Sequence, residues 1–119
     1  MSMSTPHQLT DPLIDLIAHR FRIIGEPLRI KLLDRLRGGE ASVGELTQAL
    51  AANQQNISRH LAVLHGAGIV TRRKRGTRTL YSIADPTVFA LCEIVCGALE
   101  HSAAELAHVL DGTVREAAS

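Results

Sequence analysis

Apolar side chains recur at helical spacing through the first part of the chain. Between positions 11 and 24 they are Leu13, Ile14, Ile17, Phe21 and Ile24. This spacing predicts an amphipathic helix, for which Asp11 can serve as the cap and Pro12 fits the first turn. Gly25 is expected to end this helix.

Three short helices are predicted next, and the last two of them form a helix-turn-helix. The first begins at Pro27 and ends at glycines 38–39. Ser42 and Glu45 have the spacing of a capping box, which starts the second. Asn53 caps the third. The apolar stripe of this third helix is Ile57, Leu61 and Leu64.

The pattern then changes to β-forming residues. Residues 69–74 and 78–83 are rich in Ile, Val, Thr, Leu and Tyr, which predicts a hairpin with its tip at residues 75–77. Asp85 and Pro86 start a last, long helix. Its apolar positions are Val88, Cys92, Val95, Leu99, Leu106 and Val109. A narrow seam of this kind is typical of a helix that packs against another helix.

These elements predict a mainly α fold, a winged helix-turn-helix in the order α-α-α-α-β-β-α. One domain is expected over residues 11–110, including a last helix that serves dimerisation. Residues 1–10 are expected to form a disordered tail and residues 111–119 a flexible one. Because a long amphipathic helix at the end of a small domain needs a partner, we expect a homodimer.

Positive charge is concentrated in one part of the chain. The formal net charge is only +1, yet residues 46–84 contain six cationic side chains and no acidic one. These cations are Arg59, Arg72, Arg73, Lys74, Arg75 and Arg78. Such segregation creates a local positive potential that the total charge conceals, and it favours a polyanionic partner.

Side chains suited to double-stranded DNA lie on the hairpin and on the helix that Asn53 caps, which is the fourth predicted helix of the chain. Near its N-terminal half the helix has Gln54, Gln55, Asn56, Ser58, Arg59 and His60. Gln and Asn pair with adenine, and Arg pairs with guanine, in the major groove. The hairpin cations Arg72, Arg73, Lys74, Arg75 and Arg78 suit phosphates. The alternative is a solvated basic hairpin without a nucleic-acid partner.

Other classes of function have less support. Single-stranded RNA surfaces use aromatic platforms, and the basic segment contains only Tyr81. Gly66 and Gly68 follow a helix, whereas a nucleotide loop follows a strand, so we expect no enzyme. No stretch approaches the roughly 18 apolar residues of a membrane span, and no signal peptide is visible. We therefore expect a cytoplasmic protein that does not enter a membrane.

The segment NISRHLAVLHGAGIVTRRKRGTRTLYSI, with IGEPLRIKLLDRL before it, resembles the ArsR/SmtB family of small dimeric repressors. The matching positions are Ser58, His60, Leu61, Leu64, Ala67, Gly68, Ile69, Val70, Gly76, Tyr81 and Ile83. The resemblance covers residues 15–100. It implies a winged-helix homodimer joined through its first and last helices. It also implies repression by operator binding and release by a small inducer, whose identity it leaves open.

Two metal sites that the resemblance implies are incomplete here. Ser42 stands where one family site has a thiolate, and a hydroxyl is a poor ligand for soft metals. Asp85 and His101 match parts of the second site, but Thr87 and Ala98 stand where histidines are expected. We therefore expect neither site to bind metal as it does in the family.

Two other groups on the last helix remain candidates for sensing. Cys92 and Cys96 lie one turn apart, and their thiolates suit a thiophilic metal, As(III), an oxidant or reactive sulfur species. Alternatively, Cys92 only packs on the apolar seam. His101, Glu105 and His108 share a face and suit Ni, Co or Zn, although a solvated polar flank of the helix is the favoured interpretation. A winged helix used for protein contacts is a further alternative.

Overall fold

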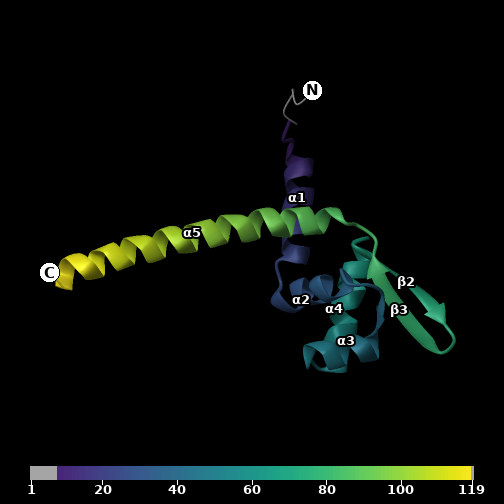
Figure 1. Ribbon diagram of the computed structural model, residues 1–119. Coiled ribbons are helices and arrows are strands. Elements are labelled where there is room, and N and C mark those ends of the chain that lie inside the picture. The colour runs from purple at the N-terminus through teal and green to yellow at the C-terminus, as the bar shows by residue number, and fades with distance from the viewer. Residues whose placement is uncertain (1–7, 119) are drawn as a thin grey trace. The chain divides into compact units, whose positions relative to one another are not determined.

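The computed structural model describes residues 8–118, with side chains described for residues 8–111, and these residues form five helices and three strands. The helices are α1 (Asp11–Ile24), α2 (Pro27–Leu36), α3 (Val43–Leu50), α4 (Gln54–Gly66) and α5 (Thr87–Ala118). The strands are β1 (Ala41–Ser42), β2 (Val70–Arg75) and β3 (Arg78–Ile83). The chain divides after Asp85 into two compact units, of which the first contains α1 to β3 and the second is α5. The predicted mainly α winged helix-turn-helix is confirmed (Figure 1).

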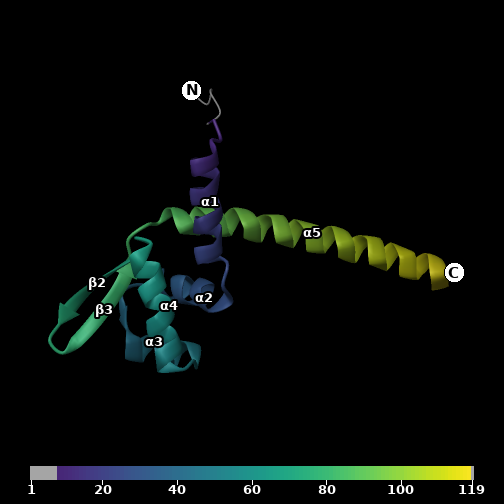
Figure 2. The same ribbon diagram turned by 180° about the vertical axis from the view of Figure 1, so that it is seen from behind.

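The core of the first unit lies among α2, α3, α4 and the base of the hairpin, which Figure 2 shows from behind. Its fully buried side chains are Leu32, Leu33, Leu46, Ile57, Leu61, Leu64, Ile69 and Val70. The apolar stripes predicted for the short helices therefore face inward. Each side chain of this size stabilises the fold by roughly 1.5–3 kcal/mol when it is fully buried.

Polar side chains cap the N-terminal ends of α1, α3 and α4. Ser42 and Glu45 form the predicted capping box: the Ser42 Oγ accepts the Glu45 N–H at 3.2 Å, and the Glu45 carboxylate accepts the Ser42 N–H at 2.9 Å. Asn53 caps α4 as predicted, accepting two backbone N–H groups at 2.7 and 3.2 Å. The predicted cap of α1 is wrong. Thr10 accepts a first-turn N–H at 3.4 Å, and Asp11 is the first helical residue.

One strand was not expected from the sequence. Ala41 and Ser42 form β1, which pairs antiparallel with β3, so the sheet order is β1-β3-β2. Both residues are buried. A strand of two residues is too short to show alternation, and for this reason the expected element order lacks it.

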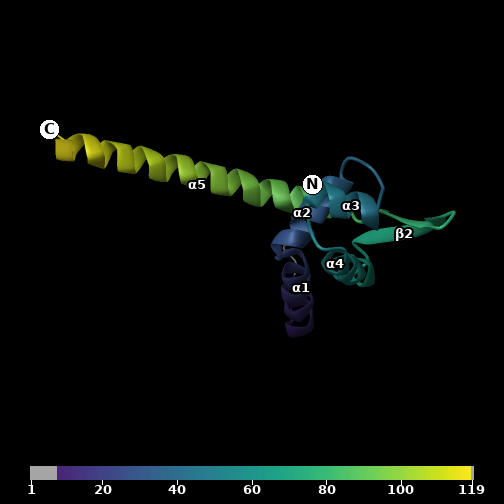
Figure 3. The ribbon, with the colours of Figure 1, turned by 90° about the horizontal axis from the view of Figure 1, so that it is seen from below.

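The β2–β3 hairpin extends beyond α3 and α4, as Figures 1 and 3 show from two directions. Its register runs from Val70 opposite Ile83 to Arg75 opposite Arg78. Gly76 begins the two-residue turn with a φ of 66°, a left-handed conformation that costs glycine little. The turn therefore fixes which side chains of the two strands share a face.

Helix α5 is longer than the sequence predicted. It runs to Ala118, through residues expected to form a flexible tail, whereas most of the expected N-terminal tail, residues 1–7, lies outside the described residues. An 18-residue window within Thr87–Asp111 has a mean hydropathy of 1.3, so α5 is long and apolar enough to cross a membrane. This corrects the expectation that no stretch approaches a membrane span. Length and composition alone do not distinguish such a span from a helix that packs against protein.

We predict that Gly25→Ala lowers the free energy of unfolding by about 1–3 kcal/mol, the usual cost of a forced overlap. Gly25 ends α1, and a Cβ there would lie 2.9 Å from the Phe21 carbonyl oxygen. Gly66→Ala is the matched control, because a Cβ at Gly66 would meet open space. Urea unfolding at fixed protein concentration measures both. Equal stability of the two variants would contradict the prediction.

Candidate nucleic-acid interface

Helix α4 divides sharply into a buried and an exposed side. Ile57, Leu61 and Leu64 have no exposed surface. The exposed polar residues of its N-terminal half are Gln54, Gln55, Asn56, Ser58 and Arg59. The Arg59 guanidinium donates to the Asn56 side-chain oxygen at 3.0 Å, which orients both groups on the surface. These five positions present amide, hydroxyl and guanidinium groups to solvent, as the sequence predicted.

His60 was expected among these surface residues, but the residue is only 6% exposed. The Arg29 Nε of α2 donates to His60 Nδ1 at 3.0 Å, and Arg29 Nη1 donates to the Ile23 carbonyl at the end of α1 at 2.9 Å. His60 is three residues after the buried Ile57 and directly precedes the buried Leu61. The helical period therefore turns its side chain inward. It is therefore not available for DNA.

Glu26 also belongs to the polar group that contains His60 and Arg29. Its carboxylate accepts the Leu28 N–H at 2.7 Å and the Arg29 N–H at 3.3 Å, and it lies 3.9 Å from His60 Nε2. Burial, assisted by the charges of Arg29 and Arg59, lowers the pKa of His60 despite the opposing charge of Glu26. The imidazole is thus held neutral, with Nδ1 as an acceptor, and the Glu26 contact is not an ion pair near neutral pH.

The hairpin cations are not equivalent, because side chains alternate between the two faces of a strand. On one face, Arg73 donates through two guanidinium nitrogens to both oxygens of Glu40. On the same face, Arg78 donates to Glu45 at 2.7 Å and to the Ser42 hydroxyl at 3.2 Å. The Arg73 hydrogen bond lowers the pKa of Glu40, and the Ser42 hydrogen bonds lower that of Glu45. Ion pairs therefore join this face to Glu40, which precedes α3, and to Glu45 in the first turn of α3.

The other face of the hairpin is not neutralised in this way. Arg72 and Lys74, with Thr79 and Tyr81, line a shallow cleft of about 430 Å³ whose edge Arg73 reaches. Within residues 8–111, neither Arg72 nor Lys74 pairs with a carboxylate. The sequence did not reveal this difference, because Glu40 and Glu45 lie outside the acid-free segment and only folding brings them to it.

The cysteines of α5 are accessible to different degrees. Cys92 is half-buried and Cys96 is exposed. The Cys96 thiol donates to the Glu100 carboxylate at 3.4 Å, and this hydrogen bond, with the nearby negative charge, raises the pKa of Cys96. The thiol is therefore less often a thiolate than an ordinary cysteine at the same pH.

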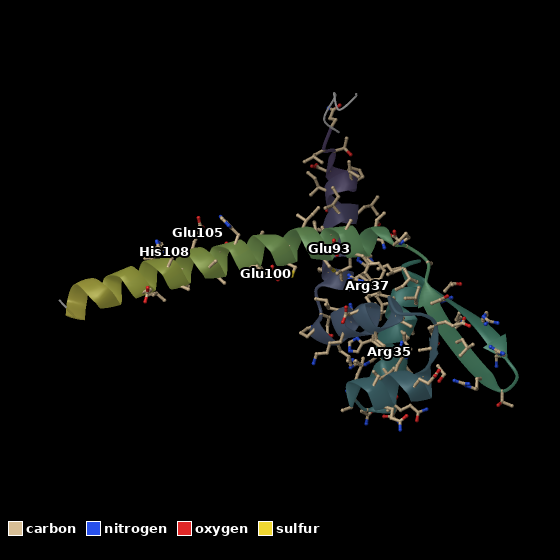
Figure 4. The ribbon with its side chains drawn as sticks, viewed as in Figure 1. Arg35, Arg37, Glu93, Glu100, Glu105 and His108 are labelled. Atoms are coloured by element: carbon tan, nitrogen blue, oxygen red, sulfur yellow. The ribbon has the colours of Figure 1, made fainter. Side chains whose placement is uncertain are left out.

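The histidines of α5 are only partly brought together. His101 Nε2 lies 3.3 Å from the Glu105 carboxylate. Figure 4 shows Glu105 and His108 on the same side of α5, with Glu100 on the other. Among the described residues of one chain, no three His, Cys, Asp or Glu side chains are grouped closely enough to hold a metal ion. A metal at this position would need ligands from elsewhere.

Known proteins resemble this chain in both sequence and fold. The model of the family described as "Bacterial regulatory protein, arsR family" matches residues 26–72. An uncharacterized HTH-type transcriptional regulator of Mycobacterium tuberculosis, Rv0081, is 36% identical over 86 residues, which are 71% of this chain and 75% of the relative. Its crystal structure has a TM-score of 0.73 at 33% identity, covering 81% of this chain and 97% of that one.

Two further relatives bear on function. A probable mercury resistance operon repressor of Streptomyces lividans is 34% identical over 91 residues, 76% of this chain and 73% of the relative. The winged helix-turn-helix DNA-binding domain of Mb0332 from Mycobacterium bovis, described as homodimeric, has a TM-score of 0.68 at 32% identity and covers 78% of this chain and 93% of that one. This chain therefore belongs to the arsR family of bacterial regulatory proteins and is a DNA-binding transcriptional regulator with a winged helix-turn-helix fold.

Proposed function

We propose that the protein is a repressor that binds an operator as a homodimer and leaves it when an inducer binds. The observation that carries this proposal is the exposed polar half of α4 next in sequence to a hairpin with cations free of carboxylate partners. In winged helix-turn-helix proteins such a helix enters the major groove, and its N-terminal residues contact base edges.

The proposed contacts divide by chemistry. Gln54, Gln55 and Asn56 suit adenine edges, and Arg59 suits guanine. Ser58 and the α4 N-terminus suit a phosphate. On the hairpin, the proposed phosphate contacts are Arg72, Lys74, Arg75, Arg73 and Arg78.

Arg73 and Arg78 are secondary contacts in this proposal. Each would have to exchange Glu40 or Glu45 for a phosphate. Exposed ion pairs contribute only about 0–1 kcal/mol, so the exchange is affordable but gains less than a contact from an unpaired cation. Arg72 and Lys74 therefore carry more of the binding.

Exposed apolar side chains support the homodimer. On α1, Leu16 is 66% exposed and Phe21 53%. On α5, Ile94 is 70% exposed and Leu99 64%. Monomeric proteins rarely leave such rows uncovered, and a two-fold related copy is the commonest cover. Mb0332, described as homodimeric, adds support from a relative. Packing against a second copy also accounts for the hydropathy of α5 without a membrane.

This proposal places the protein in the cytoplasm, where the DNA is, and gives it no reaction to catalyse. A symmetric dimer would present its two α4 helices about 34 Å apart, one turn of B-DNA. The operator is then expected to contain two related half-sites.

We expect the protein to bind DNA from upstream of its own gene, with two chains per site and with affinity that falls steeply as salt rises. Arg72→Ala and Lys74→Ala should each lower the slope of log affinity against log salt by about one. Arg78→Ala should lower it less, because Arg78 already pairs with Glu45. Fluorescence anisotropy from 50 to 300 mM salt, on the order of the range over which such contacts weaken, measures this.

Lys31→Ala is the control, since Lys31 is exposed on α2, outside α4 and the hairpin. Failure of the wild-type protein to bind any fragment of the genome even at low salt would rule out the proposal. It would favour a winged helix that contacts other proteins.

For the inducer, we propose a thiophilic metal or metalloid ion held by Cys92 and Cys96. The two thiols are one turn apart on α5, the proposed dimer helix, and a second copy could add its own pair. The similarity to a probable mercury resistance operon repressor of Streptomyces lividans supports a soft ion. Oxidants and reactive sulfur species are less favoured, because Glu100 keeps Cys96 protonated, whereas a soft ion displaces the thiol proton when it binds.

A Ni, Co or Zn sensor is the second candidate. His101 and Glu105 are already paired at 3.3 Å, and Glu105 and His108 lie on one side of α5 (Figure 4). Imidazole and carboxylate suit these ions. The remaining ligands would have to come from the second copy.

Cd, Hg or As(III) should release the protein from operator DNA, and Cys92→Ser with Cys96→Ser should abolish that release. Ser replaces a soft ligand with a hard one of similar size, so the fold and DNA affinity should be kept. Anisotropy of the preformed complex follows the release. Release by Ni, Co or Zn alone, lost in His101→Gln, would transfer the site to the histidines.

Glu100→Gln should accelerate alkylation of Cys96 by iodoacetamide at pH 7.5, a value chosen as roughly one unit below an ordinary thiol pKa. The substitution removes the charge and the hydrogen bond that raise the pKa of Cys96. Glu105→Gln is the matched control on the same helix. Mass spectrometry after digestion with a protease that cleaves at glutamate separates Cys96 from Cys92, because Glu93 lies between them. Equal rates in all three proteins would contradict the prediction.

A further inference from the structure

A partly buried polar group, in which only the His60 side chain is fully buried, lies directly behind the exposed side of α4. It consists of His60 on α4, Arg29 and Glu26 at the start of α2, and the Ile23 carbonyl at the end of α1. His60 follows Arg59, one of the proposed base contacts, by a single residue. The group joins three helices through side-chain hydrogen bonds, and the DNA contacts proposed above do not use it.

The hydrogen-bonded pair of His60 and Arg29 is not needed to fill the space that the two side chains occupy. Apolar side chains of similar volume bury at no hydrogen-bonding cost, and buried polar groups are costly unless they are paired. The hydrogen bonds, however, are directional, whereas the apolar stripe of Ile57, Leu61 and Leu64 is not. The stripe determines which side of α4 is buried, and a small rotation or slide of the helix changes its burial little.

We infer that His60 is a positioning residue for operator recognition, which sets the rotation of α4 through its hydrogen bond with Arg29. Arg29 is itself fixed twice, by its bond to His60 at 3.0 Å and by its bond to the Ile23 carbonyl at 2.9 Å. A guanidinium is planar, so these two acceptors together define its orientation. The inference rests on the proposed function, because it concerns which bases α4 reaches.

The same bonds relate α4 to α1. Ile23 is the second-last residue of α1, the helix whose exposed apolar side chains we assign to the homodimer, and its carbonyl accepts from Arg29. A shift of the C-terminal end of α1 therefore moves the group that orients His60. The position of α4 therefore depends on the end of α1 as well as on the core against which α4 packs.

His60→Leu tests the role of the imidazole. We expect it to weaken binding to the operator about tenfold, the usual effect of losing a hydrogen bond to a charged group. Binding to random DNA and the salt slope should not change, because the phosphate contacts remain. His60→Asn should recover most of the operator affinity, since its side-chain oxygen can take the place of Nδ1. His65→Leu is the matched control in the last turn of α4.

Arg29→Lys provides a second route if His60→Leu does not fold. A lysine cannot donate to His60 and Ile23 in the same fork, so the ratio of operator to random-DNA affinity should fall as it does in His60→Leu. The effects of Arg29→Lys and His60→Leu should not be additive if both act through one bond. Thermal unfolding of each variant reports the folded fraction at the assay temperature.

Protonation supplies a readout that packing alone would not change. The charges acting on His60 are Glu26 and Arg29 from α2 and Arg59 from α4 itself. Its pKa is lowered, so the folded protein keeps Nδ1 as an acceptor down to a pH below the ordinary histidine value of about 6.5. Below the lowered pKa, protonation removes that acceptor. The operator preference should then fall, and it should fall less in His60→Asn.

Three outcomes are distinguishable. A reduced operator preference in folded His60→Leu, restored in His60→Asn, supports the inference. A lower melting temperature with wild-type preference in both variants overturns it and leaves His60 a packing residue. Absence of operator binding by the wild-type protein overturns the proposed function instead.

Discussion

Ile57, Leu61 and Leu64 are fully buried beneath α4, and this contact with the short helices around it decides which residues of α4 meet solvent. Once these three face inward, the 3.6-residue period leaves Gln54, Gln55, Asn56, Ser58 and Arg59 outside. The same period turns His60 toward α2. Every functional assignment for this helix depends on that division, because a residue can reach a base edge only if the core does not claim it.

Electrostatics in the folded chain differ from electrostatics along the sequence. The acid-free segment is uniformly basic in sequence, yet Glu40 and Glu45 lie against one face of the hairpin and pair with Arg73 and Arg78. Arg75, opposite Arg78, lies on this same face. Because strand side chains alternate, Arg72 and Lys74 lie on the other face, where neither pairs with a carboxylate of residues 8–111. A phosphate backbone would therefore meet less competition there than at Arg73 and Arg78.

The proposed function gives helix α5 two roles, dimerisation and ion binding, which conflict in a monomer. Its apolar side chains, such as Ile94 and Leu99, are largely exposed and need a cover, while Cys92 and Cys96 must remain accessible if they bind an ion. A dimer resolves this conflict when the thiols lie at the edge of the covered face, and the greater exposure of Cys96 is in keeping with such an edge. An ion bound there would act on the dimer geometry, and through it on the spacing of the two α4 helices.

The sequence by itself determined the helices, the hairpin, the helix-turn-helix and the polar face of α4. These follow from local rules of period, capping and turn chemistry, which act over a few residues. Tertiary structure alone decided the strand at Ala41–Ser42, the burial of His60 and the pairing of Arg73 and Arg78. These three features join residues more than thirty positions apart, or depend on which way a helix faces. No local pattern records such a contact, because its energy exists only after the chain has brought the partners together.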